Sequence, residues 1–143
     1  MTISKTLEIS VGHRLHLYVG PCSNFHGHNY KVNIHIDYSQ EENFIRKEGF
    51  YIDFAKLKKI IVEAYDHKFL MSMDDQYVTD IKKLNLPGFK FVPYSPTAEN
   101  IAIDMAGLLY NLIKKKNGNL ESVKIEIFET SNSSVIFAIH NNR

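Results

Sequence analysis

The sequence predicts an α+β fold, a four-stranded antiparallel sheet with two helices on one face, in the chain order β-β-α-α-β-β. Three observations lead to this prediction. Two runs of alternating apolar and polar residues open the chain, two more close it, and two apolar stripes at helical spacing lie between them. A chain of 143 residues fits one domain, residues 1–143, and can bury a real core.

The two opening runs predict a hairpin. The first strand covers about residues 2–13, and the second covers about residues 28–39, before a polar turn at Ser39–Asn43. The apolar faces of the two strands consist of Ile3, Leu7, Ile9, Val11 and His13 on the first, and Val32, Ile34, Ile36 and Tyr38 on the second. In an antiparallel pair, the end of the first strand lies beside the start of the second.

The middle of the chain predicts the first helix. A short extended piece is expected at Phe50–Ile52, followed by Asp53 as the cap of a helix that ends near Phe69. The apolar stripe of this helix is Phe54, Leu57, Ile61, Ala64 and Tyr65. Residues 72–94 are long for a loop, and we expect a short helical piece around Val78–Leu84.

A second helix and two strands complete the chain. Ser95 is expected to cap the helix, with Pro96 in its first turn and Asn117-Gly118 as its end. Its buried stripe is predicted as Ile101, Met105, Leu108 and Leu112. The closing strands are predicted at residues 122–129 and 134–140. Exposed edges of such a sheet invite oligomers.

The composition excludes several classes of partner. A formal charge of +1 gives no sign of a nucleic-acid groove or a polybasic membrane face. No apolar run approaches the roughly 18 residues of a membrane span, and Met1–Ser10 lacks the architecture of a secretory signal. A single cysteine fits a reducing compartment, so we expect a cytoplasmic protein.

Three histidines predict a zinc site. His13 ends the apolar face of the first strand, while His26 and His28 share the parity of the apolar face of the second. The hairpin brings all three imidazoles to one place, and three nitrogen ligands with an open fourth position are typical of catalytic zinc. The alternative is that each histidine is an ordinary hydrogen-bonded core residue. The other histidines are expected at the surface, namely His16, His35 and His140, with His67 considered separately below.

Cys22 and the pair Asp66-His67 are the candidate acid–base groups. Cys22 lies in the loop between the two histidine-bearing strands, where a bound dication would lower its pKa towards neutrality. Alternatively it is an inert buried thiol. In Asp66-His67 a carboxylate beside an imidazole suits a proton relay, but a histidine is also common at the end of a helix.

Glu129 is unusual because it ends the apolar face of a strand that contains Val123, Ile125 and Ile127. A buried carboxylate needs a partner, and a ligand with two coplanar N–H donors would match it. Glu99, in the first turn of the second helix, either favours the helix dipole or acts as a second anchor.

The chain resembles the 6-pyruvoyltetrahydropterin synthase / 6-carboxytetrahydropterin synthase family. The matching strings occur in family order: Gly12-His13-Arg14-Leu15, Cys22-Ser23-Asn24-Phe25-His26-Gly27-His28-Asn29-Tyr30, Ile52-Asp53-Phe54, Asp66-His67-Lys68-Phe69-Leu70, Pro96-Thr97-Ala98-Glu99-Asn100 and Glu129-Thr130. The short loop from His13 to His26 and the position of Cys22 look most like the bacterial 6-carboxy branch. Residues 72–94 depart from that branch by being longer than expected.

The resemblance implies a tunnelling fold, in which sheets join edge to edge into a barrel and two trimeric rings stack into a homohexamer. It also implies roles for site residues. Zinc would be bound by His13, His26 and His28, and a proton-transfer triad would be formed by Cys22, Asp66 and His67. The pterin edge would be bound by Glu129, helped by Thr97, Glu99 and Thr130. Sites would lie between subunits.

The implied activity is that of a zinc-dependent lyase acting on a reduced pterin triphosphate. The 6-carboxy branch converts 7,8-dihydroneopterin triphosphate to 6-carboxy-5,6,7,8-tetrahydropterin, releasing acetaldehyde and triphosphate, for queuosine-type deazaguanine synthesis. The 6-pyruvoyl branch keeps the three-carbon side chain, on the way to tetrahydrobiopterin. Two alternatives of another class are a non-catalytic pterin- or metal-binding oligomer and a small structural protein with a chance histidine cluster.

Overall fold

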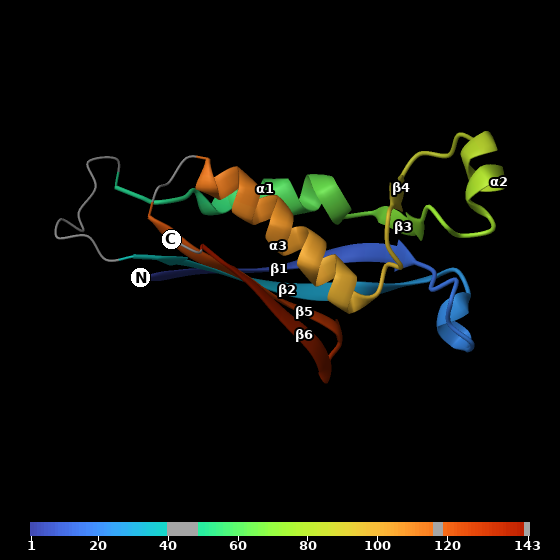
Figure 1. Cartoon of the computed structure of the whole chain (residues 1–143), viewed down its shortest axis with the longest axis horizontal. Helices are drawn as coiled ribbons and strands as arrows, with labels where there is room; N and C mark the ends of the chain where they lie inside the picture. Colours follow the sequence, from blue (N-terminus) through green and yellow to red (C-terminus); the bar gives the residue numbers. More distant parts are fainter. Residues whose placement is uncertain (40–48, 116–118, 142–143) are drawn as a thin grey trace.

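The computed structural model describes residues 1–39, 49–115 and 119–141 and confirms an α+β fold. Its strands and helices, in chain order, are β1 (Thr2–His13), a 3₁₀ turn η1 (Pro21–Ser23), β2 (His26–Tyr38), α1 (Phe54–Tyr65), β3 (Lys68–Ser72), α2 (Val78–Lys83), β4 (Phe89–Val92), α3 (Ala98–Lys114), β5 (Leu120–Thr130) and β6 (Ser133–His140). Figure 1 shows α1 and α3 on one face of a twisted sheet, with α2 at one end of the elongated molecule. No helix in the described part is long and apolar enough to cross a membrane.

Within the described residues the sheet has six strands in the order β4-β3-β1-β2-β5-β6, so the predicted four-stranded sheet was wrong. The four predicted strands are present as β1, β2, β5 and β6, paired antiparallel. The two additional strands pair parallel to each other, and β3 pairs parallel to β1 over Val11–His13 alone. A parallel segment of this kind was missed because its strands are only four and five residues long.

The end of α1 explains the error. Helix α1 begins after Asp53, whose side chain accepts a hydrogen bond from the N–H of Ala55, as predicted. It ends at Tyr65 rather than near Phe69, because Asp66 is extended and His67 has a φ of 55°. Neither conformation continues a helix. Residues 70–72 are then buried in succession, as in a strand that is covered on both faces.

Helix α3 begins two residues later than predicted. Thr97 is its cap, and its hydroxyl accepts the N–H of Asn100 at 3.4 Å. The side-chain amide of Asn100 donates to the carbonyl of Ser95 at 2.9 Å. Pro96 therefore lies outside the helix, and its carbonyl oxygen forms a hydrogen bond with His13 in the site described below. The buried face continues through Leu109 and Ile113, whereas Leu108 is half-buried and Leu112 exposed.

The other sequence predictions had mixed outcomes. The short helical piece is confirmed as α2, but Phe50–Ile52 form bends and coil rather than a strand. The turn after Ser39 and the helix end at Asn117-Gly118 lie outside the described residues.

The core fills the space between the sheet and the helices α1 and α3. It is built by the predicted apolar faces of β1, β2 and β5, including Ile9, Ile34 and Ile125, packed against Ile61 and Met105. The opposite face of β1 and β2 is polar, with cross-strand pairs such as Thr6 with Asn33. The register of the β1–β2 pair places His13 opposite His26 and Val11 opposite His28, as the predicted hairpin requires.

Candidate metal centre and adjoining cavity

Three histidines gather where the strands β1 and β2 end and begin. One ring nitrogen from each of His13, His26 and His28 lies within 4.8 Å of the other two. The Nε2 atoms of all three rings are buried and have no hydrogen-bond partner among the described residues. Buried polar atoms are normally satisfied, so three that converge on one point fit a metal ion as their common partner. The structure brings the three histidines together as predicted, and a set of three imidazoles is a donor set that fits zinc.

Backbone carbonyls orient two of the rings. The Nδ1 of His13 lies 2.7 Å from the carbonyl oxygen of Pro96, and the Nδ1 of His26 lies 2.9 Å from that of Asn24. A carbonyl only accepts, so each Nδ1 carries the proton and each Nε2 presents a lone pair. Burial lowers the pKa of His13, which favours the neutral form that binds metals.

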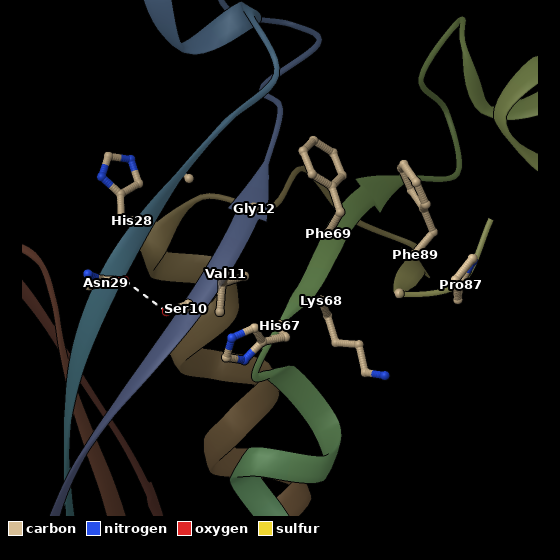
Figure 2. Close-up of a pocket in the computed structure, with 12 residues that line it drawn as sticks. Ser10, Val11, Gly12, His28, Asn29, His67, Lys68, Phe69, Pro87 and Phe89 are labelled. Carbon is tan, nitrogen blue, oxygen red and sulfur yellow. Dashed lines mark hydrogen bonds between the residues drawn. The ribbon is translucent and has the colours of Figure 1, made fainter.

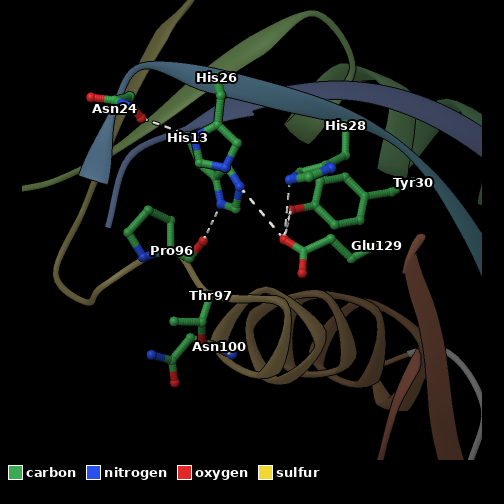
Figure 3. Close-up of polar contacts among 9 residues, drawn as sticks. All are labelled: His13, Asn24, His26, His28, Tyr30, Pro96, Thr97, Asn100 and Glu129. Atoms are coloured by element: carbon green, nitrogen blue, oxygen red, sulfur yellow. Dashed lines mark hydrogen bonds and ion pairs between the residues drawn. The ribbon is translucent and has the colours of Figure 1, made fainter. Parts of the chain in front are cut away.

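Glu129 faces the histidine cluster (Figure 3). Its Oε1 lies 3.4 Å from the Nε2 of His28 and 3.6 Å from that of His13. The hydroxyl of Tyr30 donates to the same oxygen at 3.2 Å. Burial, together with the nearby carboxylate, raises the pKa of Tyr30, so the phenol stays protonated and remains a donor. Glu129 thus ends the buried face of β5, as predicted, and has a partner there.

Sequence reasoning did not identify Tyr30, Asn24 or Pro96. Tyr30 gave the clearest signal, because it follows His26 and His28 in phase and places a hydroxyl next to them on the buried face. Asn24 and Pro96 act through backbone carbonyls, which no side-chain pattern reveals.

A cavity of about 370 Å³ adjoins Glu129. Cys22, Thr97 and Glu99 line it together with Glu129, so four predicted site residues lie around one space. Cys22 is a free thiol on the partly buried loop between β1 and β2. Thr130 is exposed, and its hydroxyl donates to Asn132 at 2.9 Å instead of lining this cavity. The volume falls in the range of small-molecule sites.

Asp66 and His67 lie between α1 and β3 and do not line the cavity beside Glu129. The Oδ1 of Asp66 accepts the N–H of Ser10 at 2.9 Å, and its Oδ2 lies 3.0 Å from the Nδ1 of His67. Burial tends to raise the pKa of Asp66, but the hydrogen bonds from Ser10 and His67 outweigh it and lower that pKa. The side chain of His67 is 82% exposed.

His67 borders a second cavity, of about 480 Å³ (Figure 2). Ser10, Gly12 and Asn29 line it too, and they have the parity of the sheet face that turns away from α1 and α3. Phe69 closes the side formed by β3. Cys22 is not among the residues that line this cavity. Among the described residues, Cys22 and Glu129 thus line one cavity, whereas His67 borders another, which His28 lines as well.

Comparison with known proteins identifies the family to which this fold and histidine cluster belong. The chain belongs to the 6-pyruvoyl tetrahydropterin synthase family, whose model matches residues 2–139. It is 32% identical over 139 residues to the 6-carboxy-5,6,7,8-tetrahydropterin synthase of Haemophilus influenzae, covering 92% of this chain and 94% of that protein. The protein of the same name from Rickettsia conorii is 29% identical over 138 residues, covering 92% of this chain and 96% of that protein.

Solved structures share the fold. An uncharacterized protein from Wolinella succinogenes matches with a TM-score of 0.71 at 24% identity, covering 99% of this chain and 98% of that one. The 6-pyruvoyl tetrahydropterin synthase of Plasmodium vivax matches with a TM-score of 0.70 at 17% identity, covering 99% of both chains. The recognition of the family from its sequence strings is confirmed.

Proposed function

We propose that the chain is a zinc-dependent lyase that converts 7,8-dihydroneopterin triphosphate to 6-carboxy-5,6,7,8-tetrahydropterin, with loss of acetaldehyde and triphosphate. The observation that carries this proposal is the convergence of three buried Nε2 atoms that make no hydrogen bond among the described residues, beside a cavity lined by Cys22 and two carboxylates. The names of the bacterial relatives, which align over most of the chain, support the 6-carboxy product. The product would serve queuosine-type deazaguanine synthesis.

The metal would be held by His13, His26 and His28. Bound zinc supplies a Lewis acid that polarises and acidifies a substrate hydroxyl at its open position. The carbonyls of Pro96 and Asn24 keep two of the ligand rings in the required tautomer.

Glu129 and its neighbours would bind the pterin. Tyr30 donates to Oε1 of Glu129, which leaves Oε2 and the second lone pair of Oε1 for ring N–H groups. Glu99 and Thr97 also line the cavity, at the start of α3, where further polar contacts can orient the ring. Thr130 would have to release Asn132 to join them.

Cys22 would carry a proton of the substrate side chain. It lines the same cavity as Glu129, so a pterin bound there brings its side chain past the thiol. A thiolate near a dication is a suitable base. A free thiol also fits the reducing cytoplasm, where we place the protein.

Asp66 and His67 would complete the site from a neighbouring copy in a homohexamer. Two sheet edges are suited to pairing with other copies: the outer edge of β6, and the part of β1 before Val11 that β3 does not cover. Such edges pair readily with other chains. His67 is exposed enough to reach a second subunit.

Mass analysis of the pterin formed from 7,8-dihydroneopterin triphosphate tests the proposal. We expect 6-carboxy-5,6,7,8-tetrahydropterin and an equal amount of acetaldehyde. A product that retains the three-carbon side chain would instead assign the 6-pyruvoyl activity. Binding without turnover would indicate a non-catalytic pterin-binding oligomer and overturn the proposal.

A further inference from the structure

The residues next to two metal-ligand candidates contact the segment Lys68–Val92, here called the excursion, which contains β3, α2 and β4. Arg14 follows His13, and Phe25 precedes His26. The ring of Phe25 stacks on Phe69 with centroids 5.2 Å apart. Figure 1 shows the excursion at the same end of the molecule as the β1–β2 loop.

Arg14 is held by a buried carboxylate. Its guanidinium donates to Oδ2 of Asp75, and the two residues are only 8% and 4% exposed. The centre of the guanidinium also lies 4.7 Å from the ring centroid of Tyr77 and 5.9 Å from that of Phe25. Burying a guanidinium without a counterion is energetically unfavourable, so the carboxylate of Asp75 stabilises Arg14 in this buried position.

Asp75 is itself fixed by its own turn. Its Oδ1 accepts the N–H of Tyr77 at 2.9 Å, and its backbone N–H donates to the carbonyl of Ser72 at 3.1 Å. The carbonyl of Asp75 accepts the N–H of Val78 at 3.0 Å, at the start of α2. The carboxylate is therefore a rigid anchor rather than a mobile surface charge.

We propose that Asp75 is a positioning residue for the metal centre, acting through Arg14. His13 and His26 are directly opposed across β1 and β2, at the end of the hairpin where the loop joins the two strands. The ion pair fixes the backbone immediately after His13, and the Phe25 stack fixes the backbone immediately before His26. The excursion thereby sets the separation of two ligands from outside the site. This inference rests on the metal site of the proposed function.

The test compares the metal affinity of Asp75→Asn with that of the wild type, by chelator competition with Zn²⁺ and by the visible spectrum of bound Co²⁺. Asn keeps the acceptor for Tyr77 but removes the charge opposite Arg14. We expect metal binding to weaken by about 10-fold, the lower end of the effect of losing a group bonded directly to a ligand, because Asp75 acts through Arg14 and the backbone. The matched control is Asp80→Asn, which removes an exposed carboxylate paired with Lys83 in the same excursion and should leave affinity unchanged.

A double-mutant cycle separates positioning from general stability. If Asp75 acts through Arg14, then Asp75→Asn should have little further effect on metal affinity in an Arg14→Met background. Equal affinity of Asp75→Asn and wild type, even with a lower melting temperature, would overturn the inference. If Asp75→Asn does not fold, Arg14→Gln replaces it, since Gln removes the positive charge that Asp75 holds and the guanidinium that stacks on Tyr77. Wild-type affinity in Arg14→Gln would likewise overturn the inference. A wild type that binds no metal would contradict the proposed function itself.

Discussion

Glu129→Gln gives a quantitative test of the pterin site. The amide keeps the shape of the side chain and an oxygen acceptor for the hydroxyl of Tyr30, but it removes the charge. Hydrogen bonds to a charged group contribute about 1.5–3 kcal/mol and neutral ones about 0.5–1.5 kcal/mol. Each of two pterin N–H donors therefore loses about 1 kcal/mol. The loss per donor is no larger because the side chain of Glu129 is 34% exposed, and solvent therefore screens part of its charge.

The expected loss for Glu129→Gln is thus about 2 kcal/mol, or roughly 30-fold in Kd. The assay is calorimetric titration with 7,8-dihydroneopterin, with zinc content measured on the same samples and expected to be intact. Glu126→Gln is the matched control, because Glu126 lies on the other face of β5 and accepts from Asn33 at 2.8 Å. Unchanged affinity in Glu129→Gln would refute the assignment of this carboxylate to the pterin.

Three further predictions concern the metal and the thiol. Cys22→Ala should keep its zinc and bind the pterin, yet turn over at least ~10²-fold more slowly, the usual general-base contribution; near-normal turnover would remove Cys22 from the mechanism. His26→Ala should empty the metal site, whereas His35→Ala, on the outer sheet face where His35 pairs with Ser4, should not; stoichiometric zinc in His26→Ala would exclude it as a ligand. Because burial lowers the pKa of His13 below 6.5, the metal-free protein should lose stability as the pH falls through 6.5, since the unfolded chain takes up a proton that the fold resists. Thermal melts of the metal-free protein should show a smaller loss for His13→Gln, and an equal loss would contradict this origin.

The hairpin could be predicted because it obeys a simple periodicity. Alternation along β1 and β2 fixes which residues share a face, and the antiparallel register then brings His13 beside His26. The parity of β5 predicted the position of Glu129 in the same way. The positions of these residues follow from the alternation within each strand and from the antiparallel pairing of β1 with β2.

The excursion could not be predicted in the same way. Its strands are short, and only Asp66 and His67 separate α1 from β3. The chain turns there because His67 has a positive φ, which nothing in the sequence indicates. Residues that act through carbonyls, such as Pro96, also leave no side-chain signal. In the proposed function His67 reaches the metal centre from a second copy of the chain, and a periodic pattern does not encode contacts between copies.

The most direct test of the central claim is acetaldehyde release from 7,8-dihydroneopterin triphosphate by metal-stripped and zinc-reconstituted protein. The account predicts no release without metal, and release restored in proportion to zinc up to about one ion per chain, the capacity of a single three-histidine site. Full release from protein shown to be free of metal would contradict it.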